Sequence, residues 1–178
     1  MDANAPTVVV GSDMPPDLFV DVSATLSSMG VVVTTENATP ERRQSKVIVV
    51  VSPKGGAGKT AVSSNLALAL AQRHPGRVVA VDLDVQFGDL GLAMSIETER
   101  NLAQLVRGNQ IDATSLKLHL TAGPNGLFVL AGAGDPVDAD AIGHAHVSEV
   151  LPMLAQSFDF VVVDTPAGLD ELTLAALE

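Results

Sequence analysis

Residues 54–60 form a glycine-rich segment that ends in Gly58-Lys59-Thr60. A glycine loop between a strand and a helix directs backbone N–H groups and the positive end of the helix toward one point, where a polyphosphate can bind. In such a loop Lys59 would contact the β- and γ-phosphates, and the Thr60 hydroxyl would ligate Mg²⁺. The predicted phosphate-binding residues are Lys54, Gly55, Gly56, Ala57, Gly58, Lys59, Thr60 and Ala61.

Carboxylates follow two other apolar runs of the chain. Asp82 and Asp84 end the run 78–84, and Asp164 follows the run 160–163. In a parallel α/β sheet, ligands bind beyond the carboxyl ends of the strands. The side chains predicted to converge there are Thr60, Asp82, Asp84 and Asp164. Because Mg²⁺ is held through few direct protein ligands, Asp164 is predicted to orient a metal-bound water. For each acid alone, the alternative is a solvated cap after a strand.

The elements that must position these residues are visible as apolar patterns. The β-branched run 47–51 predicts a strand buried on both faces. Apolar residues at helical spacing after the loop predict a helix that ends at 74–76, His-Pro-Gly. The runs 78–84 and 160–163 predict two more strands. Together they indicate an α/β fold with a mostly parallel sheet.

The loop departs from the general pattern G-x-x-x-x-G-K-[ST], because Pro53 stands where its first glycine would be. It carries a second lysine, Lys54, and the sequence KGGAGKT resembles the deviant Walker A loop of the ParA/MinD family of ATPases. The segment 82–90, DLDVQFGDL, together with Asp164-Thr165-Pro166, is most similar to the CpaE/TadZ branch, which acts in Flp-pilus assembly. The resemblance covers about residues 46–178.

This resemblance implies a three-layer P-loop NTPase fold and Mg²⁺-dependent ATP hydrolysis. It implies that Asp84 positions the attacking water at the metal and that Asp164 is the Walker B acid. Lys54 would reach the phosphates of a second copy in an ATP-sandwiched homodimer. The implied catalytic residues are Lys54, Lys59 and Asp84, and the implied metal residues are Thr60, Asp84 and Asp164. Family members continue with further strands and helices, whereas 14 residues follow Asp164 here, so we expect a C-terminally short domain.

Composition restricts the partners. Ten Lys and Arg against 21 Asp and Glu give a net charge of −11, which argues against DNA binding through neutralised phosphates. No apolar run approaches the roughly 20 residues that span a bilayer, and residues 169–178 contain no basic residue for an amphipathic membrane anchor. The absence of cysteine excludes disulfides and thiolate-ligated clusters and is consistent with the cytoplasm. We expect a cytoplasmic protein, recruited to a pole or to the inner membrane by a partner.

Three regions are predicted. Residues 1–34 form a short β-α-β unit with strands at 7–10 and 31–33 and a helix at 18–29, residues 35–46 form a linker, and residues 47–178 form the ATPase domain. Within that domain we expect short helices at 102–106 and 113–120, a strand at 127–130 and a loop at 131–136. The stretch 139–156 is predicted to be helical and broken by Pro152.

The function expected from these features is Mg²⁺-dependent ATP binding and slow hydrolysis, in the positioning or assembly of a pilus or secretion machine. The alternative is a non-catalytic nucleotide-binding scaffold that dimerises or recruits a partner. A bacterial tyrosine kinase with a similar loop is disfavoured, because the chain has no tyrosine to autophosphorylate.

Overall fold

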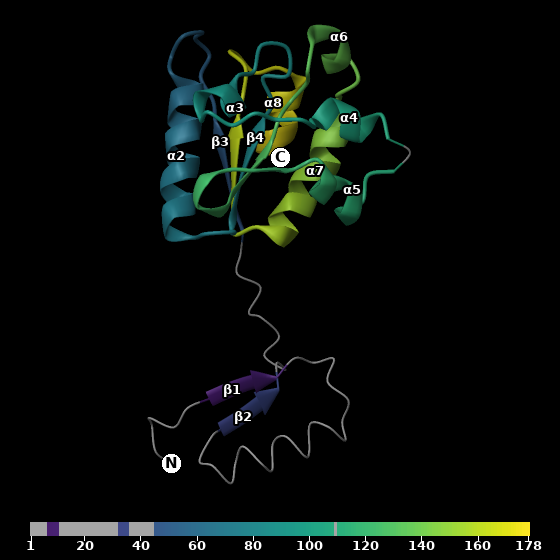
Figure 1. Cartoon of the computed structure of the whole chain (residues 1–178). Coiled ribbons are helices and arrows are strands. Elements are labelled where there is room, and N and C mark those ends of the chain that lie inside the picture. The colour runs from purple at the N-terminus through teal and green to yellow at the C-terminus, as the bar shows by residue number, and fades with distance from the viewer. Residues whose placement is uncertain (1–6, 11–31, 36–44, 109) are drawn as a thin grey trace. The chain divides into compact units, whose positions relative to one another are not determined.

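The computed structural model (Figure 1) describes residues 7–10, 32–35, 45–108 and 110–178. The chain divides into two compact units, residues 1–43 and 44–178. The division falls inside the predicted linker 35–46. The two end residues of that linker belong to strands instead, because Thr35 ends β2 and Lys46 begins β3.

In the first unit two strands pair in parallel, β1 (Thr7–Val10) and β2 (Val32–Thr35), with Thr7 opposite Val32. The first strand is where the sequence predicted it, and the second lies one to two residues later than predicted. The predicted helix 18–29 lies outside the described residues.

The second unit is built on a five-stranded sheet with the order β3-β7-β4-β6-β5. The strands are β3 (Lys46–Val50), β4 (Val78–Asp82), β5 (Thr121–Ala122), β6 (Leu127–Leu130) and β7 (Phe160–Asp164). Only the pairing of β5 with β6 is antiparallel. The expected α/β fold with a mostly parallel sheet is therefore confirmed.

Helices cover both faces of this sheet (Figure 1). They are α2 (Lys59–Arg73), α3 (Leu90–Ala93), α4 (Leu102–Val106), α5 (Ala113–Leu118), α6 (Pro136–Ala139), α7 (His144–Ser157) and α8 (Glu171–Leu177), with a 3₁₀ turn, η1 (Pro124–Gly126). No helix in the described ranges combines the length and apolar character needed to cross a membrane.

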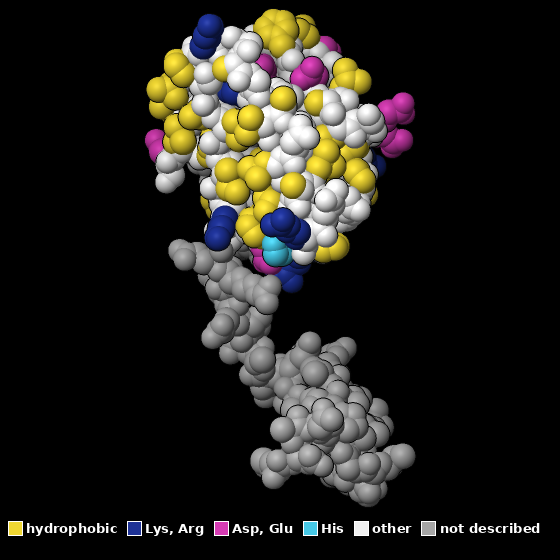
Figure 2. Space-filling model, turned by 90° about the vertical axis from the view of Figure 1, so that its left-hand side faces the viewer, with side chains coloured by type: hydrophobic (Ala, Val, Ile, Leu, Met, Phe, Trp, Pro, Cys, Tyr) yellow, Lys and Arg dark blue, Asp and Glu magenta, His cyan; other side chains and the backbone are white. Residues whose placement is uncertain are grey.

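Two hydrophobic cores, one on each face of the sheet, make the three layers. Alternate residues of a strand point to opposite faces, so Val78 and Ala80 pack against α2 and α3, whereas Val79 and Val81 pack against α4, α7 and α8. Between Lys59 and Arg73 the helix α2 carries no charged side chain. Figure 2, which looks onto this side of the molecule, accordingly shows mainly apolar and uncharged surface, with basic side chains toward its upper and lower ends.

The prediction that the run 47–51 is buried on both faces is wrong. Within the described residues β3 has one neighbour, β7, and forms an edge of the sheet. Val47 in this strand and Val51 just after it are each 42% exposed. A run of β-branched residues indicates a strand but not its place in the sheet, because edge and central strands share the same local preference.

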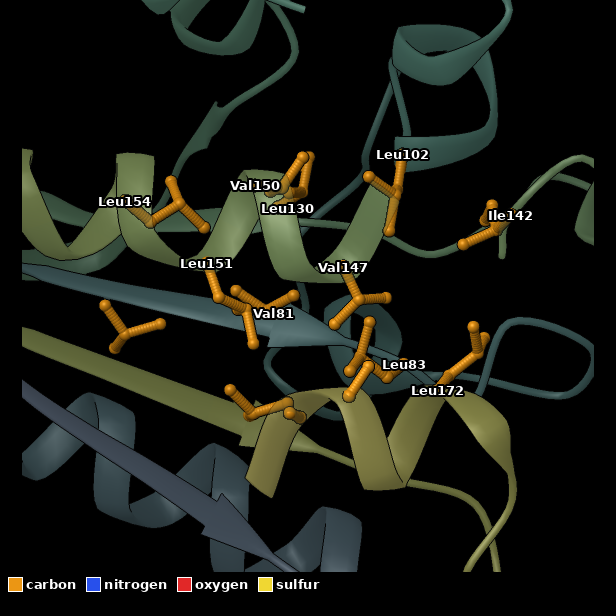
Figure 3. Packing of buried hydrophobic residues seen from close by; sticks show 14 of the residues in the cluster. Val81, Leu83, Leu102, Leu130, Ile142, Val147, Val150, Leu151, Leu154 and Leu172 are labelled. Atoms are coloured by element: carbon orange, nitrogen blue, oxygen red, sulfur yellow. The ribbon is translucent and has the colours of Figure 1, made fainter. Parts of the chain in front are cut away.

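The prediction of a helix from 139 to 156 broken at Pro152 is also wrong. A first short helix, α6, begins at Pro136, with the Asp135 carboxylate accepting a hydrogen bond from the Asp138 N–H at 2.8 Å. After Gly143 the helix α7 then runs through Pro152 without interruption. Proline removes one backbone hydrogen bond, but α7 buries an apolar face over the sheet that offsets the loss. The buried residues of this face are Val147, Val150, Leu151 and Leu154, and Figure 3 shows Val147 and Leu151 pointing toward Val81 and Leu83.

The smaller elements agree well with the sequence. Helix α4 and strand β6 have the predicted bounds, and α5 ends two residues earlier than predicted, at Leu118. Asn101 and Gln104 form a capping box at the start of α4, in which each side chain accepts a hydrogen bond from the backbone N–H of the other. Such reciprocal caps satisfy two N–H groups that the helix start leaves free.

Candidate nucleotide site

The carboxyl ends of β3, β7 and β4 lie side by side. Val50 is opposite Asp164, and Asp164 is opposite Asp82. Both acids are the last residues of their strands, and only Asp84 lies beyond its strand. The predicted convergence of the strand ends is therefore present at the edge from which the glycine loop departs.

The loop presents the positive end of α2. This helix begins at Lys59, and its N-cap is Gly58 with φ of 82°, a left-handed conformation that favours glycine. Its first regular bond runs from the Val62 N–H to the Gly58 carbonyl at 2.9 Å. The N–H groups before Val62 belong to the first turn, which has no intrahelical partners and here contains no acidic side chain. An anion at this end of a 15-residue helix is favoured by both the dipole and these donors.

The base of the loop is tied to the segment that follows β7. The Thr165 hydroxyl donates to the Val50 carbonyl at 2.8 Å, and the Gly168 N–H donates to the Ser52 carbonyl at 3.0 Å. The Ser52 hydroxyl in turn accepts a hydrogen bond from the Lys54 N–H at 3.2 Å. The backbone at Lys54 is thus held while its side chain is exposed.

Asp164 is fully buried, and only one of its two carboxylate oxygens has a hydrogen-bond partner in the described residues. Its Oδ1 accepts a hydrogen bond from the Ser63 hydroxyl at 2.8 Å, whereas its Oδ2 is buried and has no hydrogen-bond partner in the described residues. A buried carboxylate oxygen without a donor is costly, so such groups usually mark a site that binds something. An Mg²⁺-bound water would supply the missing donor.

The donor set suits Mg²⁺ better than a metal that needs an all-protein cage. No group of three or more His, Cys, Asp or Glu side chains in the part of the chain that the structure describes is arranged to hold a metal ion. Mg²⁺ takes one or two protein ligands, with waters and phosphate oxygens completing its octahedron. The Thr60 hydroxyl on the first turn of α2 and the free oxygen of Asp164 fit that requirement.

Asp82 serves the structure of the site. It is 3% exposed, and both of its oxygens accept backbone hydrogen bonds, from the Asp84 N–H at 3.0 Å and from the Leu90 N–H at 3.1 Å. Its carboxylate therefore holds both ends of the loop 83–90. Gly88 lies so close that a Cβ there would stand 2.4 Å from both carboxylate oxygens. Burial raises the pKa of Asp82, the hydrogen bond from the Leu90 N–H lowers it, and repulsion from Asp164 raises it, which together bring it to about 7.

Asp84 interacts electrostatically with charged residues around the glycine loop. Burial raises the pKa of Asp84, a backbone hydrogen bond from Phe87 lowers it, and the charge of Asp164 raises it. Attraction to Lys59 acts in the opposite direction to this repulsion. Asp84 thus interacts with both the phosphate-loop lysine and the buried acid of β7.

Comparison with known proteins agrees with this geometry. The family described as AAA domain, AAA_31, matches residues 45–178. The septum site-determining protein MinD of Escherichia coli K12 is 37% identical over 134 residues, which are 74% of this chain and 48% of MinD. The chain belongs to the ParA/MinD family of P-loop ATPases. It spans about half the length of the curated relatives that it matches.

Solved structures of this family share the fold. A ParA family ATPase from Chlorobium tepidum TLS superposes with a TM-score of 0.69 at 26% identity, covering 76% of this chain and 57% of the other. The MinD protein of Pyrococcus horikoshii OT3, solved as a complex with Mg-ADP, superposes with a TM-score of 0.64 at 30% identity, covering 75% and 54%.

Sequence reasoning missed two features of this site. Asp82 lies at the converging strand ends, as predicted, but the sequence did not show that both of its oxygens accept backbone hydrogen bonds. It also did not select Ser63. This polar residue lies four positions after Lys59 and three after Thr60, on the side of the helix that faces the sheet, and that spacing is visible in the sequence.

Proposed function

We propose that this chain binds ATP with Mg²⁺ at residues 54–61 and hydrolyses it slowly. The observation that carries the proposal is the buried Asp164 oxygen that has no hydrogen-bond partner in the described part of the chain, on a strand next to the helix whose N-terminus carries the glycine loop. A donor-rich helix end and a buried acceptor without a donor together match a magnesium–phosphate ligand.

Each residue has a role that follows from its place. The loop amides and Lys59 hold the phosphates, while Thr60 and Asp164 hold the Mg²⁺, directly and through water. When bound, the ion neutralises negative charge on the phosphates. Asp84 accepts a hydrogen bond from the attacking water and so orients it. Positioning and electrostatic stabilisation carry most of this kind of catalysis.

We further propose an ATP-dependent homodimer in which Lys54, the lysine of a deviant Walker A loop, acts on the phosphates bound by a second copy. The exposed side chain and anchored backbone of Lys54 support this role. In a MinD/ParA-type family the associated process is the positioning of a cellular structure. The similarity of segment 82–90 to the CpaE/TadZ branch favours assembly of a pilus or secretion machine, in the cytoplasm, with recruitment to a pole or the inner membrane by a partner.

DNA is not a proposed partner. The net charge is −11, and the side shown in Figure 2 carries its basic side chains toward the upper and lower ends, with mainly uncharged surface between the two ends. Non-specific DNA binding needs clustered Lys and Arg side chains that neutralise several phosphates together.

The alternative, a scaffold that binds ATP, dimerises or recruits a partner but turns over negligibly, uses the same site. The enzyme and the scaffold differ only in whether bound ATP is hydrolysed, so single-turnover hydrolysis measured beside nucleotide binding separates the two functions. A protein that binds ATP with Mg²⁺, dimerises and releases no phosphate would be the scaffold.

The first test of the site is Lys59→Ala. Lys59 lies in the first turn of α2, where its ammonium reaches the bound phosphates. Loss of such a charge-assisted contact costs about 1.5–3 kcal/mol, so we expect affinity for Mg-ATP to fall about 10- to 150-fold by calorimetry. Lys117→Ala, an exposed lysine on α5, is the control and should bind as the wild type does. Equal affinity of wild type and Lys59→Ala would contradict the proposal.

A further inference from the structure

We infer that Ser63 is a positioning residue that orients the Asp164 carboxylate for the magnesium ion. The inference rests on the proposed function, since it concerns the same site. Ser63 is fully buried in α2, and its hydroxyl oxygen lies 2.8 Å from Asp164 Oδ1. The contact joins residues 101 positions apart in the sequence and connects the phosphate-binding helix to strand β7.

The single proton of this hydroxyl has two possible acceptors. The Lys59 carbonyl lies 3.0 Å from the Ser63 Oγ, and Asp164 Oδ1 lies 2.8 Å from it. The Lys59 carbonyl already accepts the regular backbone bond within α2. Asp164 Oδ1 has no other hydrogen-bond donor in the described residues, and a bond to a carboxylate is about twice as strong as one between neutral groups. The proton is therefore donated to Asp164.

The consequence is an asymmetric carboxylate. With Oδ1 held by Ser63, the plane of the carboxylate is fixed, and Oδ2 is left without a hydrogen-bond donor among the described residues. A fixed free oxygen can accept from a metal-bound water without losing orientational freedom when the metal binds. Residues that hold a metal-site ligand in this way typically account for about 10- to 100-fold in metal affinity.

The chain contains a matched control. Ser64 is the next residue, is 3% exposed, and donates its hydroxyl to the Ala61 carbonyl at 3.3 Å within the same helix. Ser64→Ala therefore removes a buried helix hydroxyl as Ser63→Ala does, but it leaves Asp164 untouched. A purely structural effect of losing such a hydroxyl would appear in both variants.

The test is calorimetric ADP binding as a function of Mg²⁺ concentration. For Ser63→Ala we expect the Mg²⁺ concentration that gives half of the Mg²⁺-dependent gain in ADP affinity to rise about 10-fold. The Mg²⁺-free affinity for ADP should stay within about twofold, because the loop amides and Lys59 are unchanged. Ser64→Ala should match the wild type in both measurements. Ser63→Cys keeps the side-chain shape with a weaker donor and should fall between, which also covers the case in which Ser63→Ala does not fold.

The outcomes separate the inference from the proposed function. Absence of Mg²⁺-dependent ADP binding by the wild type would overturn the proposed function and this inference with it. If the wild type binds but Ser63→Ala and Ser63→Cys require the same Mg²⁺ concentration as the wild type, only the role of Ser63 is overturned. Equal shifts in the Ser63 and Ser64 variants would also overturn it, because they would show a general effect on the helix.

Discussion

The Lys54→Ala variant is expected to hydrolyse ATP about 10³-fold or more slowly than the wild type, while its affinity for nucleotide stays within a few-fold of the wild-type value. A cation supplied at the transferring phosphoryl group from a second subunit changes turnover by that amount and contributes little to binding by one subunit. The structure favours this division, because the Lys54 backbone is anchored to Ser52 while the side chain is exposed. The measurements are single-turnover hydrolysis and calorimetry, with Lys117→Ala as the control.

Asp84→Ala should separate hydrolysis from dimerisation. If Asp84 orients the attacking water and Lys54 bridges to the second copy, Asp84→Ala loses hydrolysis but retains an ATP-bound dimer, whereas Lys54→Ala loses both. Sedimentation with ATP measures this difference. Hydrolysis and dimerisation by Lys54→Ala at wild-type levels, in a protein that itself hydrolyses ATP, would show that Lys54 is a solvated loop residue.

Asp82→Asn is expected to remove a large pH dependence of stability. Burial raises the pKa of Asp82 from 3.8 to about 7 in the folded protein. Between these values the folded protein keeps a proton that the unfolded chain has released, so stability falls as the pH rises from about 4 to about 7. Above that window both states are ionised, and the loss is complete. A shift of about three pKa units corresponds to a decrease in the free energy of unfolding on the order of 4 kcal/mol at most.

Urea unfolding at about pH 4.5 and about pH 7.5 tests this behaviour. The asparagine cannot ionise, so the stability of Asp82→Asn should change with pH less steeply than that of the wild type. Asp140→Asn, at an exposed position, should keep the wild-type dependence. The same difference between the two pH values for wild type and Asp82→Asn would show that Asp82 does not titrate in this range.

The sequence predicted most elements of the second unit, because the signals for them are local. The stop at 74–76 defined the end of α2, and turn residues before Leu127 defined the start of β6. The position of a strand in its sheet is not a local property, which is why β3 was predicted as buried on both faces although it lies at an edge of the sheet in the described residues. Pro152 was overestimated as a helix breaker, because the tertiary packing of α7 compensates for one missing hydrogen bond.

For the site, the sequence indicated which residues come together but not what each oxygen contacts. Spacing and strand ends predicted that the side chains of Thr60, Asp82, Asp84 and Asp164 converge. That Asp82 would be occupied by two backbone donors depends on the path of the loop 83–90, which in turn requires the close approach of Gly88. The contact of Ser63 with Asp164 depends on how α2 lies against β7, which no local pattern specifies.

The two bonds that join the glycine loop to the segment after β7 also bear on how the site opens. Because Val50 accepts from Thr165 and Ser52 accepts from Gly168, the base of the loop and the segment leading into α8 cannot separate without breaking both bonds. Exchange of the Gly168 amide proton with solvent requires its bond to the Ser52 carbonyl to break. The exchange rate of the Gly168 amide, although this residue lies outside the loop, therefore reports how often the base of the loop separates from the segment after β7.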